Sequence, residues 1–256
     1  MPSVARINIT PVKSTTLHHP PCVELGPRGA EGDRRFFLVD GDGRRFSGDR
    51  KGPLLAVRAD HDPATDRLRF RLPEGAEAEG PAAATGDALV VNFYGRDVPA
   101  HLVPGPWEGM LSAFVGRPVR LARPDRTGDA LDVEPVTLVS LASVDELSRQ
   151  GGSEGRVDPD RFRMLLEVDG CGPHEEDRWW GRLLKIGRAV IRAGAPVPRC
   201  VVTTLDPATG MRDFPTLSVI KRYRGVTSGN ELPFGIYGRV ERVGAVAVGD
   251  RIDLLD

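Results

Sequence analysis

The chain has 256 residues, enough for one large domain or two modest ones with a buried core. Its 35 Lys+Arg and 36 Asp+Glu residues give a formal net charge of −1, which argues against nucleic acid or an anionic membrane surface as a partner. The 30 glycines and 22 prolines predict many tight turns, and therefore a mostly β fold of short strands rather than long helices.

Export and membrane signals are not visible in the sequence. The start, MPSVARINIT, has no apolar core of a signal peptide, and no stretch reaches the roughly 20 apolar residues that span a bilayer. The three cysteines, Cys22, Cys171 and Cys200, have neither zinc-finger nor iron–sulfur spacing. We therefore expect a reducing cytoplasm, where free thiols persist and one of them can have a chemical role.

The first half of the chain is dominated by strand patterns. A polar, low-complexity stretch at 73–87 predicts a surface loop, and apolar residues at helical spacing predict a short helix over 107–115. A polar segment at 122–133 predicts a domain junction. Period-two alternation and turn residues predict short strands, typical of a small barrel or sandwich, at residues 3–10, 35–39, 44–47, 54–59, 66–72, 88–93 and 98–103.

The second half mixes strands with two short helices. Ser143 and Glu146 form a possible capping box that would open a helix ending at Gly151-Gly152, and a second helix is expected over 215–223. An apolar run lies at 135–141 and a loop is expected at 171–181. Strands are predicted at 161–168, 183–193, 201–205 and 238–255. The predicted class is mostly β, rich in β-barrels (α+β), with a few short helices.

The segment around Cys200 has the features of a reactive thiol. Pro196 and Pro198 stiffen the backbone before it, and the neighbouring cation Arg199 favours the thiolate, which is the form that binds soft metals. Thr203 and Thr204 add hydroxyl donors. Spacing alone leaves a second interpretation open, because a free cysteine at a strand start is often a buried core residue.

This segment resembles a known family. RCVVTTLDPATG at 199–210 is very similar to the signature around the molybdenum-ligating cysteine of the MOSC family. The whole chain resembles members with an N-terminal β-barrel domain, which include the mitochondrial amidoxime-reducing component and its bacterial relatives. Further motifs resemble the family in the same order: TPVKS at 10–14, GDRRFFLVD at 32–40, RFR at 161–163 with VDG at 168–170, EDRWWG at 176–181, PFGIY at 233–237 and VGD at 248–250.

The resemblance implies a domain layout, a cofactor and a set of contacts. Residues 1–125 would form the N-terminal β-barrel domain, and residues 126–256 the MOSC domain. Cys200 would ligate the metal of a molybdenum cofactor, Mo-molybdopterin, and act as the catalytic residue. The cofactor, including its anionic phosphate, would be contacted by Lys13, Ser14, Arg35, Arg163, Arg199, Thr203 and Tyr237.

The sequence also departs from the family pattern. Met164 and Leu165 replace a usual Pro-Asn, so an amide that could bind the cofactor is missing, and Glu134 would bring negative charge near an anionic cofactor. These changes bear on cofactor affinity and on the substrate.

Other polar residues are interpreted as ordinary. His18 and His19 fit exposed loop histidines better than a proton source, and His174 with its acidic neighbours fits a surface loop better than a metal cluster. Trp179-Trp180 would pack in the core or at the domain junction. Cys22 and Cys171 would be structural.

The function implied by the resemblance is a molybdenum-dependent oxidoreductase that reduces N-hydroxylated or N-oxide substrates. The chain has neither four ferredoxin-type cysteines nor a GxGxxG fingerprint, so electrons would come from a separate flavin or iron–sulfur protein. Two alternatives stay open. Cys200 could carry a persulfide or a cofactor in transit, or the chain could be a metal-free binding module.

Overall fold

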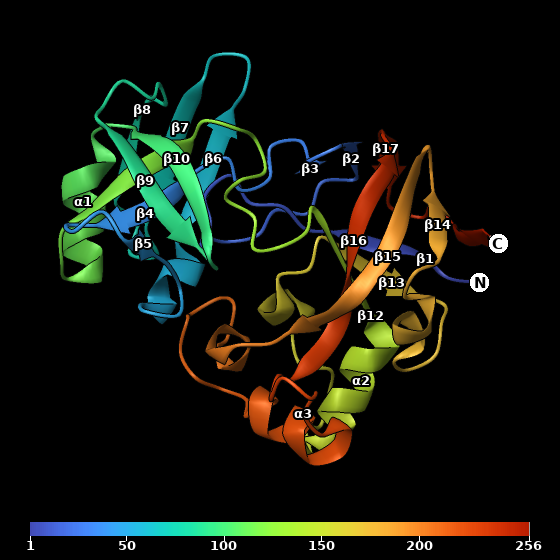
Figure 1. The fold of residues 1–256 in the computed structure, drawn as a ribbon. Helices are drawn as coiled ribbons and strands as arrows, with labels where there is room; N and C mark the ends of the chain where they lie inside the picture. The colour runs from blue at the N-terminus through green and yellow to red at the C-terminus, as the bar shows by residue number, and fades with distance from the viewer. Residues whose placement is uncertain (256) are drawn as a thin grey trace.

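The computed structural model describes residues 1–255, which form two β-rich lobes (Figure 1). The larger sheet lies in the lobe at the right of Figure 1, where helices α2 (Leu141–Gln150) and α3 (Thr216–Arg224) lie below it. Its seven strands follow the order β1 (Ser3–Ile7), β13 (Leu166–Asp169), β12 (Val136–Ser140), β16 (Pro233–Arg242), β15 (Ala189–Pro198), β14 (Leu183–Ile186) and β18 (Ile252–Leu255). The predicted mostly β class is confirmed.

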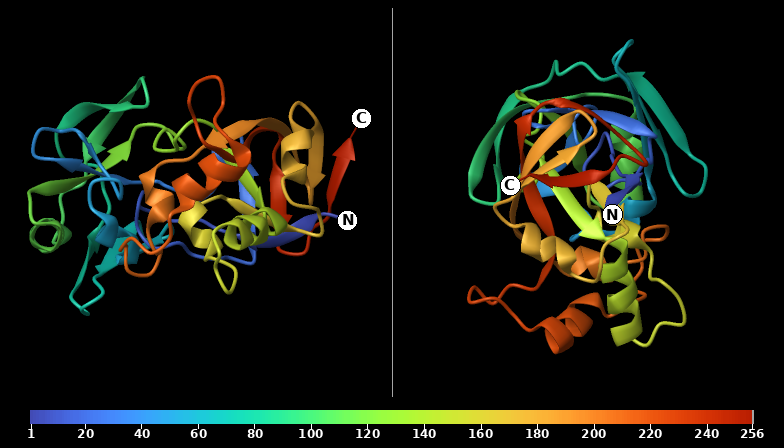
Figure 2. Two further views of the ribbon diagram at one scale, coloured as in Figure 1. Left: turned by 90° about the horizontal axis from the view of Figure 1, so that it is seen from below. Right: turned by 90° about the vertical axis from the view of Figure 1, so that its right-hand side faces the viewer.

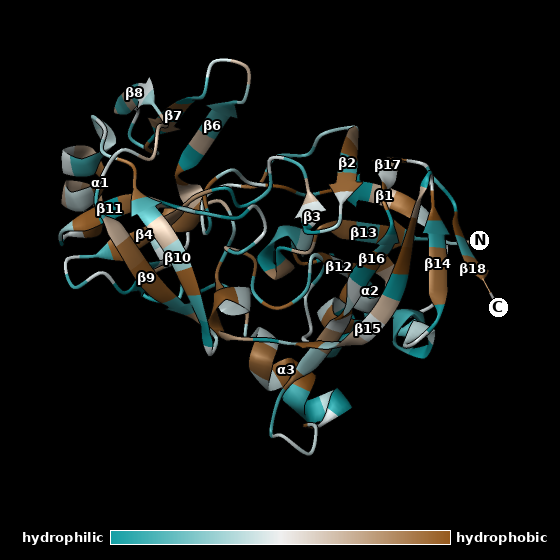
Figure 3. Cartoon of the chain, turned by 45° about the horizontal axis from the view of Figure 1, so that its top comes forward, coloured by the Kyte–Doolittle hydropathy of each residue, from teal (hydrophilic) through white to brown (hydrophobic). Residues whose placement is uncertain are grey.

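The other lobe contains two antiparallel sheets and helix α1 (Trp107–Val115). One sheet has the order β5 (Arg45–Phe46), β4 (Phe37–Asp40), β11 (Val119–Pro124), β10 (Arg96–Leu102) and β9 (Ala88–Phe93). The other has the order β6 (Arg58–Asp62), β7 (Arg67–Arg71) and β8 (Glu77–Pro81). Figure 3 shows apolar residues gathered along the strands of both lobes.

Side-chain alternation explains why these segments become strands. In β7 the apolar Leu68 and Phe70 are fully buried, whereas the arginines between and beside them are exposed and pair with Glu77 and Glu79 of β8. Helix α1 buries Trp107, Leu111 and Val115 on one face and ends at Gly116, whose φ of 78° suits glycine.

The first three strands belong in space to the C-terminal lobe, although Val12, between the first and second of them, packs in the core of the N-terminal lobe. Strand β1 pairs with β13, and β2 (Cys22–Gly26) lies between β17 (Gly244–Ala247) and β3 (Gly29–Ala30). The chain then enters the N-terminal lobe, and both termini lie together at the far end of the C-terminal lobe (Figures 1 and 2). The division at residues 125 and 126 stays a prediction.

Several predicted elements are wrong locally. The expected loop at 73–87 contains β8, whose outward glutamates made it look like a polar loop. The expected strand at 54–59 is split into the 3-10 helix η1 (Gly52–Ala56), which Pro53 helps to start, and part of β6. The strand expected at 161–168 is divided between η2 (Pro159–Phe162) and β13, and the loop at 171–181 contains η3 (Glu175–Trp179).

The predicted capping box is also wrong. Ser140, not Ser143, is the N-cap of α2, and the Ser143 hydroxyl instead donates to the buried Glu176 carboxylate at 2.8 Å. Glu146 pairs with Arg149 on the helix surface. Within residues 1–255, no helix is long and apolar enough to cross a membrane.

Candidate functional site

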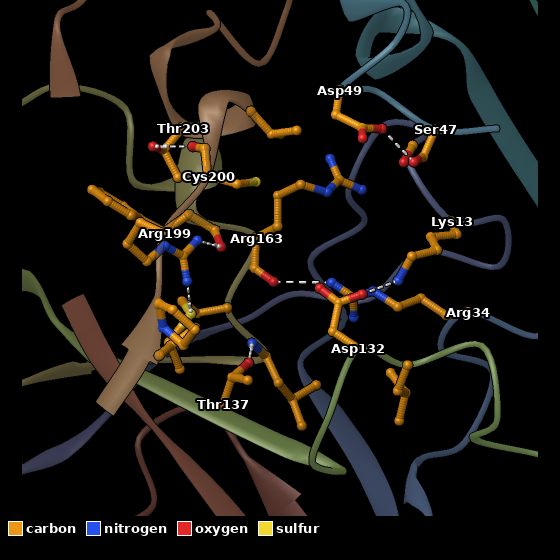
Figure 4. Close-up of a pocket in the computed structure, with 18 of the residues that line it drawn as sticks. Lys13, Arg34, Ser47, Asp49, Asp132, Thr137, Arg163, Arg199, Cys200 and Thr203 are labelled. Carbon is orange, nitrogen blue, oxygen red and sulfur yellow. Dashed lines mark hydrogen bonds and ion pairs between the residues drawn. The ribbon is translucent and has the colours of Figure 1, made fainter. Parts of the chain in front are cut away.

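A cavity of about 280 Å³ lies between the two lobes, with walls from both. The N-terminal part of the chain contributes Lys13, Ser14 and Arg45, while Arg163 and Cys200 come from the C-terminal part. Figure 4 shows Arg199 and Cys200 on one side, Lys13, Arg34 and Asp132 on the other, and Arg163 between them. The TPVKS motif lies here because the chain passes from one lobe to the other at this point.

Cys200 is exposed at the cavity wall, two residues after the end of β15. The expected strand at 201–205 is instead the 3-10 helix η4 (Val201–Thr204), because the backbone N–H and the hydroxyl of Thr203 both donate to the Cys200 carbonyl, at 3.1 and 2.9 Å. The Thr203 carbonyl in turn accepts hydrogen bonds from Arg161 and Thr216. These contacts fix the turn that presents the thiol.

Arg199 is a half-buried cation whose Nε donates to no described acceptor. Its guanidinium lies over the Phe162 ring, 5.4 Å from the centroid, and its Nη1 donates to the Met164 sulfur at 3.2 Å. Burial lowers the pKa of Arg199. Its Nε is buried and has no hydrogen-bond acceptor among the described residues, so the cavity wall offers an unsatisfied donor to a bound group.

Four cavity residues have a left-handed backbone: Ser14, Arg34, Tyr94 and Arg163, with φ values of 71°, 46°, 51° and 54°. Within residues 1–255, only seven non-glycine residues have positive φ, so more than half of this strain is gathered at one cavity. Such conformations cost roughly 1–3 kcal/mol each and cluster at functional sites.

Burial, together with the nearby charge of Arg34, lowers the pKa of Arg163 to about 10.

Two ion pairs lie on the wall opposite Cys200 (Figure 4). Lys13 pairs with Asp132 and also donates to the Ala130 carbonyl at 3.0 Å, and Arg34 pairs with Asp33. Burial lowers the pKa of Lys13. Desolvation acts to raise the pKa of Asp132, but the charges of Lys13, Arg34 and Arg45 outweigh it and bring that pKa to about 2.

The charges that remain after pairing are mostly positive. Glu134 lines the cavity but forms an ion pair with Arg239 at 2.6 Å, so its negative charge is largely compensated. Among the described residues, Arg45, Arg163 and Arg199 have no carboxylate partner. Asp49 is the one cavity carboxylate without an ion-pair partner among the described residues, and it accepts a hydrogen bond from Ser47 at 2.6 Å. The cavity therefore suits an anionic ligand.

The structure brings together seven of the eight predicted site residues: Lys13, Ser14, Arg163, Arg199, Cys200, Thr203 and Tyr237. Thr203 uses its hydroxyl on the Cys200 carbonyl and so shapes the turn. Burial raises the pKa of Tyr237 to about 12, so its phenol keeps its proton.

Arg35 is the exception. It lines a separate cavity of about 530 Å³ together with His18, His19 and His61, and its neighbour Arg34 faces the cavity of Cys200 instead. Arg34 stands in the same GDRR segment, so the motif itself contained the signal. No local signal pointed to Arg45, Tyr94 or Asp132, which tertiary folding brings to the cavity.

The departures from the family pattern also lie at this cavity. Met164 and Leu165 line its wall and are buried, and the Leu165 backbone N–H donates to the Thr137 hydroxyl at 2.8 Å. Leu165 is also part of the main apolar core of the C-terminal lobe. An apolar side chain therefore replaces an amide at this wall.

The remaining sequence predictions have mixed outcomes. Trp179 is in the core, whereas Trp180 is 63% exposed, so that half of the tryptophan prediction is wrong. His174 contacts Tyr223, with 3.1 Å between Nε2 and the hydroxyl. Within residues 1–255, no group of three or more His, Cys, Asp or Glu side chains could hold a metal. Cys22 is exposed, and Cys171 donates to Ser140 at 3.4 Å.

Comparison with known proteins defines the class. The MOSC domain model matches residues 125–253 and the model of the MOSC N-terminal beta barrel domain matches residues 1–114. The chain therefore belongs to the MOSC family. The relatives that it matches include proteins named mitochondrial amidoxime-reducing component.

Three curated relatives indicate the range of similarity. Mitochondrial amidoxime reducing component 2 of Macaca fascicularis is 35% identical, over 98% of this chain and 82% of its own length. The bovine component 2 is 36% identical over 47% of this chain and 37% of its own. Molybdenum cofactor sulfurase of Caenorhabditis briggsae is 25% identical over 93% of this chain and 34% of its own. Among solved structures, the YuaD protein from Bacillus subtilis covers 98% of this chain, with a TM-score of 0.45 and 15% identity.

The cavity fits a molybdenum cofactor on its own chemistry. One exposed thiol offers a single soft ligand, and no other cluster could complete a metal's coordination within residues 1–255, so a metal here must bring most of its ligands with it. A pterin dithiolene does so. Its anionic phosphate matches the uncompensated Arg163 and the unsatisfied Nε of Arg199.

Proposed function

We propose that this chain is a molybdenum-cofactor-dependent reductase of N-hydroxylated or N-oxide compounds. The observation that carries the proposal is the exposed Cys200 thiol at the wall of a cavity whose unpaired charges are mainly cationic. A family with amidoxime-reducing relatives supports the reaction class.

The residues of the cavity would have separate roles in binding the metal and the anionic groups of the cofactor. Cys200 would ligate molybdenum as the thiolate, and Arg163 and Arg199 would hold the cofactor's anionic groups. Lys13 and Arg34, although already paired, would add positive potential from the opposite wall. When bound, the cofactor would supply two-electron oxygen-transfer chemistry, while the protein supplies placement and electrostatics.

Tyr237 would act as a hydrogen-bond donor at the cavity wall. Burial keeps Tyr237 protonated, with its pKa raised to about 12, so it can donate a hydrogen bond to an oxygen leaving the substrate. Electrons would come from a separate flavin or iron–sulfur protein. We also propose a reducing, cytoplasmic location, which keeps the three cysteines free.

Turnover of an N-hydroxylated compound tests this function. Protein loaded with the cofactor in a competent host is mixed with benzamidoxime and reduced methyl viologen, and benzamidine is quantified by chromatography. We expect turnover in the wild type and none above background in Cys200→Ser. A fully loaded, folded wild type that produces no benzamidine, and that also fails with an N-oxide, would contradict the proposal.

Sulfur or cofactor handling is the second candidate, and the similarity to molybdenum cofactor sulfurase favours it. In that case Cys200 would carry a persulfide or hold a cofactor in transit. Cyanide-releasable sulfur on Cys200, in protein without bound molybdenum, would support this alternative over the reductase.

A further inference from the structure

The position of Arg45 in the cavity is fixed by contacts with Ser47 and Tyr94, while part of its guanidinium has no hydrogen-bond acceptor among the described residues. It comes from β5, and its Nη1 donates to the Ser47 hydroxyl at 2.9 Å and to the Tyr94 hydroxyl at 3.3 Å. Its guanidinium carbon lies 4.7 Å from the centroid of the Tyr94 ring and 5.7 Å from that of Phe93. Stacking and two hydrogen bonds therefore fix the position of the charge.

The other edge of the same guanidinium is free. Among the described residues, Nε and Nη2 of Arg45 donate to no acceptor, and no carboxylate forms an ion pair with it. Asp49 is linked to Arg45 only through the Ser47 hydroxyl. An Nε–Nη2 edge presents two parallel donors, which is the geometry that binds both oxygens of a carboxylate.

The position of Arg45 suits an exchanging ligand better than a resident one. Arg45 is half-buried and Tyr94 is 55% exposed, whereas Lys13 on the same side is 7% exposed. Desolvation raises the pKa of the Tyr94 hydroxyl, so the phenol is protonated and brings no negative charge to Arg45. Arg45 is thus at the outer part of the cavity that contains Cys200.

We propose that Arg45, braced by Tyr94, binds a carboxylate on the substrate and selects N-hydroxylated compounds that carry one. This inference rests on the proposed function, because it assigns the substrate class of the same site. The bound carboxylate would place the N-hydroxyl group at the other end of the molecule toward Cys200.

Matched substrates and matched variants test the selection. The ratio of KM for benzamidoxime to KM for 4-carboxybenzamidoxime is measured in the wild type, Arg45→Gln and Arg44→Gln. Arg44 has the same charge on the adjacent residue, but it is 70% exposed and pairs with Asp42. We expect a ratio of about ten in the wild type and in Arg44→Gln, and about one in Arg45→Gln.

A binding measurement without turnover separates this inference from the proposed function. Titration calorimetry with 4-amidinobenzoate and benzamidine, on folded protein checked by thermal unfolding, should show the carboxylate preference in the wild type and its loss in Arg45→Gln. Arg45→Lys, which keeps the charge without the fork, should retain part of it. Equal affinity for the two ligands in the wild type would overturn the inference even if both amidoximes are reduced. Carboxylate-selective binding without any turnover would contradict only the reductase.

Discussion

Arg163 combines a left-handed backbone with a half-buried charge at the cavity of Cys200. Its φ is 54°, its Nη2 donates to the Thr15 carbonyl at 2.7 Å, and no described carboxylate pairs with it. Natural side chains avoid this conformation unless the surroundings impose it. The guanidinium, which Figure 4 shows between the two walls, is a contact for the anionic group of the cofactor under the proposed function.

Replacing Arg163 by glycine tests that contact. Glycine adopts a φ of 54° without strain, so Arg163→Gly should change the free energy of unfolding by less than about 1 kcal/mol. Loss of a charge-assisted contact should weaken cofactor retention roughly tenfold or more. Molybdenum and pterin in the purified protein, together with chemical denaturation, provide the two readouts.

Asn230 provides the control for this substitution. It also has positive φ, at 59°, but it lies outside the cavity, so Asn230→Gly should keep its cofactor. Normal cofactor content in Arg163→Gly would show that this arginine has only a structural role.

At the scale of elements, η3 and α3 are joined by a cluster that depends on a neutral histidine. His174 precedes η3 and contacts Tyr223 of α3, and Arg224 pairs with Asp177 at 2.7 Å. Burial, with a contribution from the charge of Arg224, lowers the pKa of His174 to about 4. Protonation of His174 in the folded protein is therefore unfavourable.

The direction of the resulting pH dependence follows from linkage. Between pH 6.5 and 4 the unfolded chain binds a proton at His174 and the folded chain does not, so stability is lost as pH falls through this range. We expect a loss of about 2 kcal/mol from this residue. Urea denaturation at pH 7 and pH 4.5 should show a smaller loss in His174→Gln than in the wild type, and equal losses would contradict the assignment.

Element types could be predicted from the sequence wherever periodicity and burial agree. Helix α1 and strand β7 have their apolar residues at helical and alternating positions, and both were predicted. Prediction failed where a side-chain contact decides the local conformation. Residues 201–205 were expected to form a strand, but the hydrogen bond from Thr203 to the Cys200 carbonyl makes residues 201–204 the 3-10 helix η4. Ser143 does not cap α2 because its hydroxyl donates to Glu176, which is distant in the sequence.

The same limit applies to the site. Cys200, Arg199 and Lys13 stand in motifs, so the sequence could indicate them without a structure. Arg45 and Tyr94 come from a short strand and a hairpin turn with no chemical signature, and only the meeting of the lobes brings them to the cavity. Arg34 and Arg35 are neighbours in one motif, and only the backbone conformation determines that Arg34, not Arg35, faces the cavity of Cys200.

At the scale of the whole molecule, the lobes meet at a close backbone contact beside the site. Gly210 ends the motif that begins at Arg199, and a methyl group at Gly210 would lie 2.0 Å from the carbonyl oxygen of Gly52 in η1. A methyl group at Gly52 would lie 2.1 Å from the carbonyl oxygen of Gly210. The backbone at the end of the cysteine motif is therefore packed directly against the backbone of η1 in the N-terminal lobe.

Gly210→Ala should disturb this contact. The substitution adds both a backbone clash and strain at a φ of 69°, so the free energy of unfolding should fall by about 2 kcal/mol or more. Gly152→Ala is the matched control, because its φ is 70° and no atom lies within 4 Å of the added methyl group. Gly152→Ala should cost only about 1 kcal/mol. Equal losses in thermal unfolding would show that the contact between the lobes adds nothing.

The proposed function requires that Cys200 holds a molybdenum cofactor. Metal analysis and absorption spectra of protein from a cofactor-competent host should show nearly one molybdenum per chain in the wild type and in Cys22→Ser, which changes another exposed cysteine. In Cys200→Ser the metal should be lost or its spectrum altered. Folded, cofactor-supplied wild type without molybdenum, or Cys200→Ser with unchanged content and spectrum, would contradict the account.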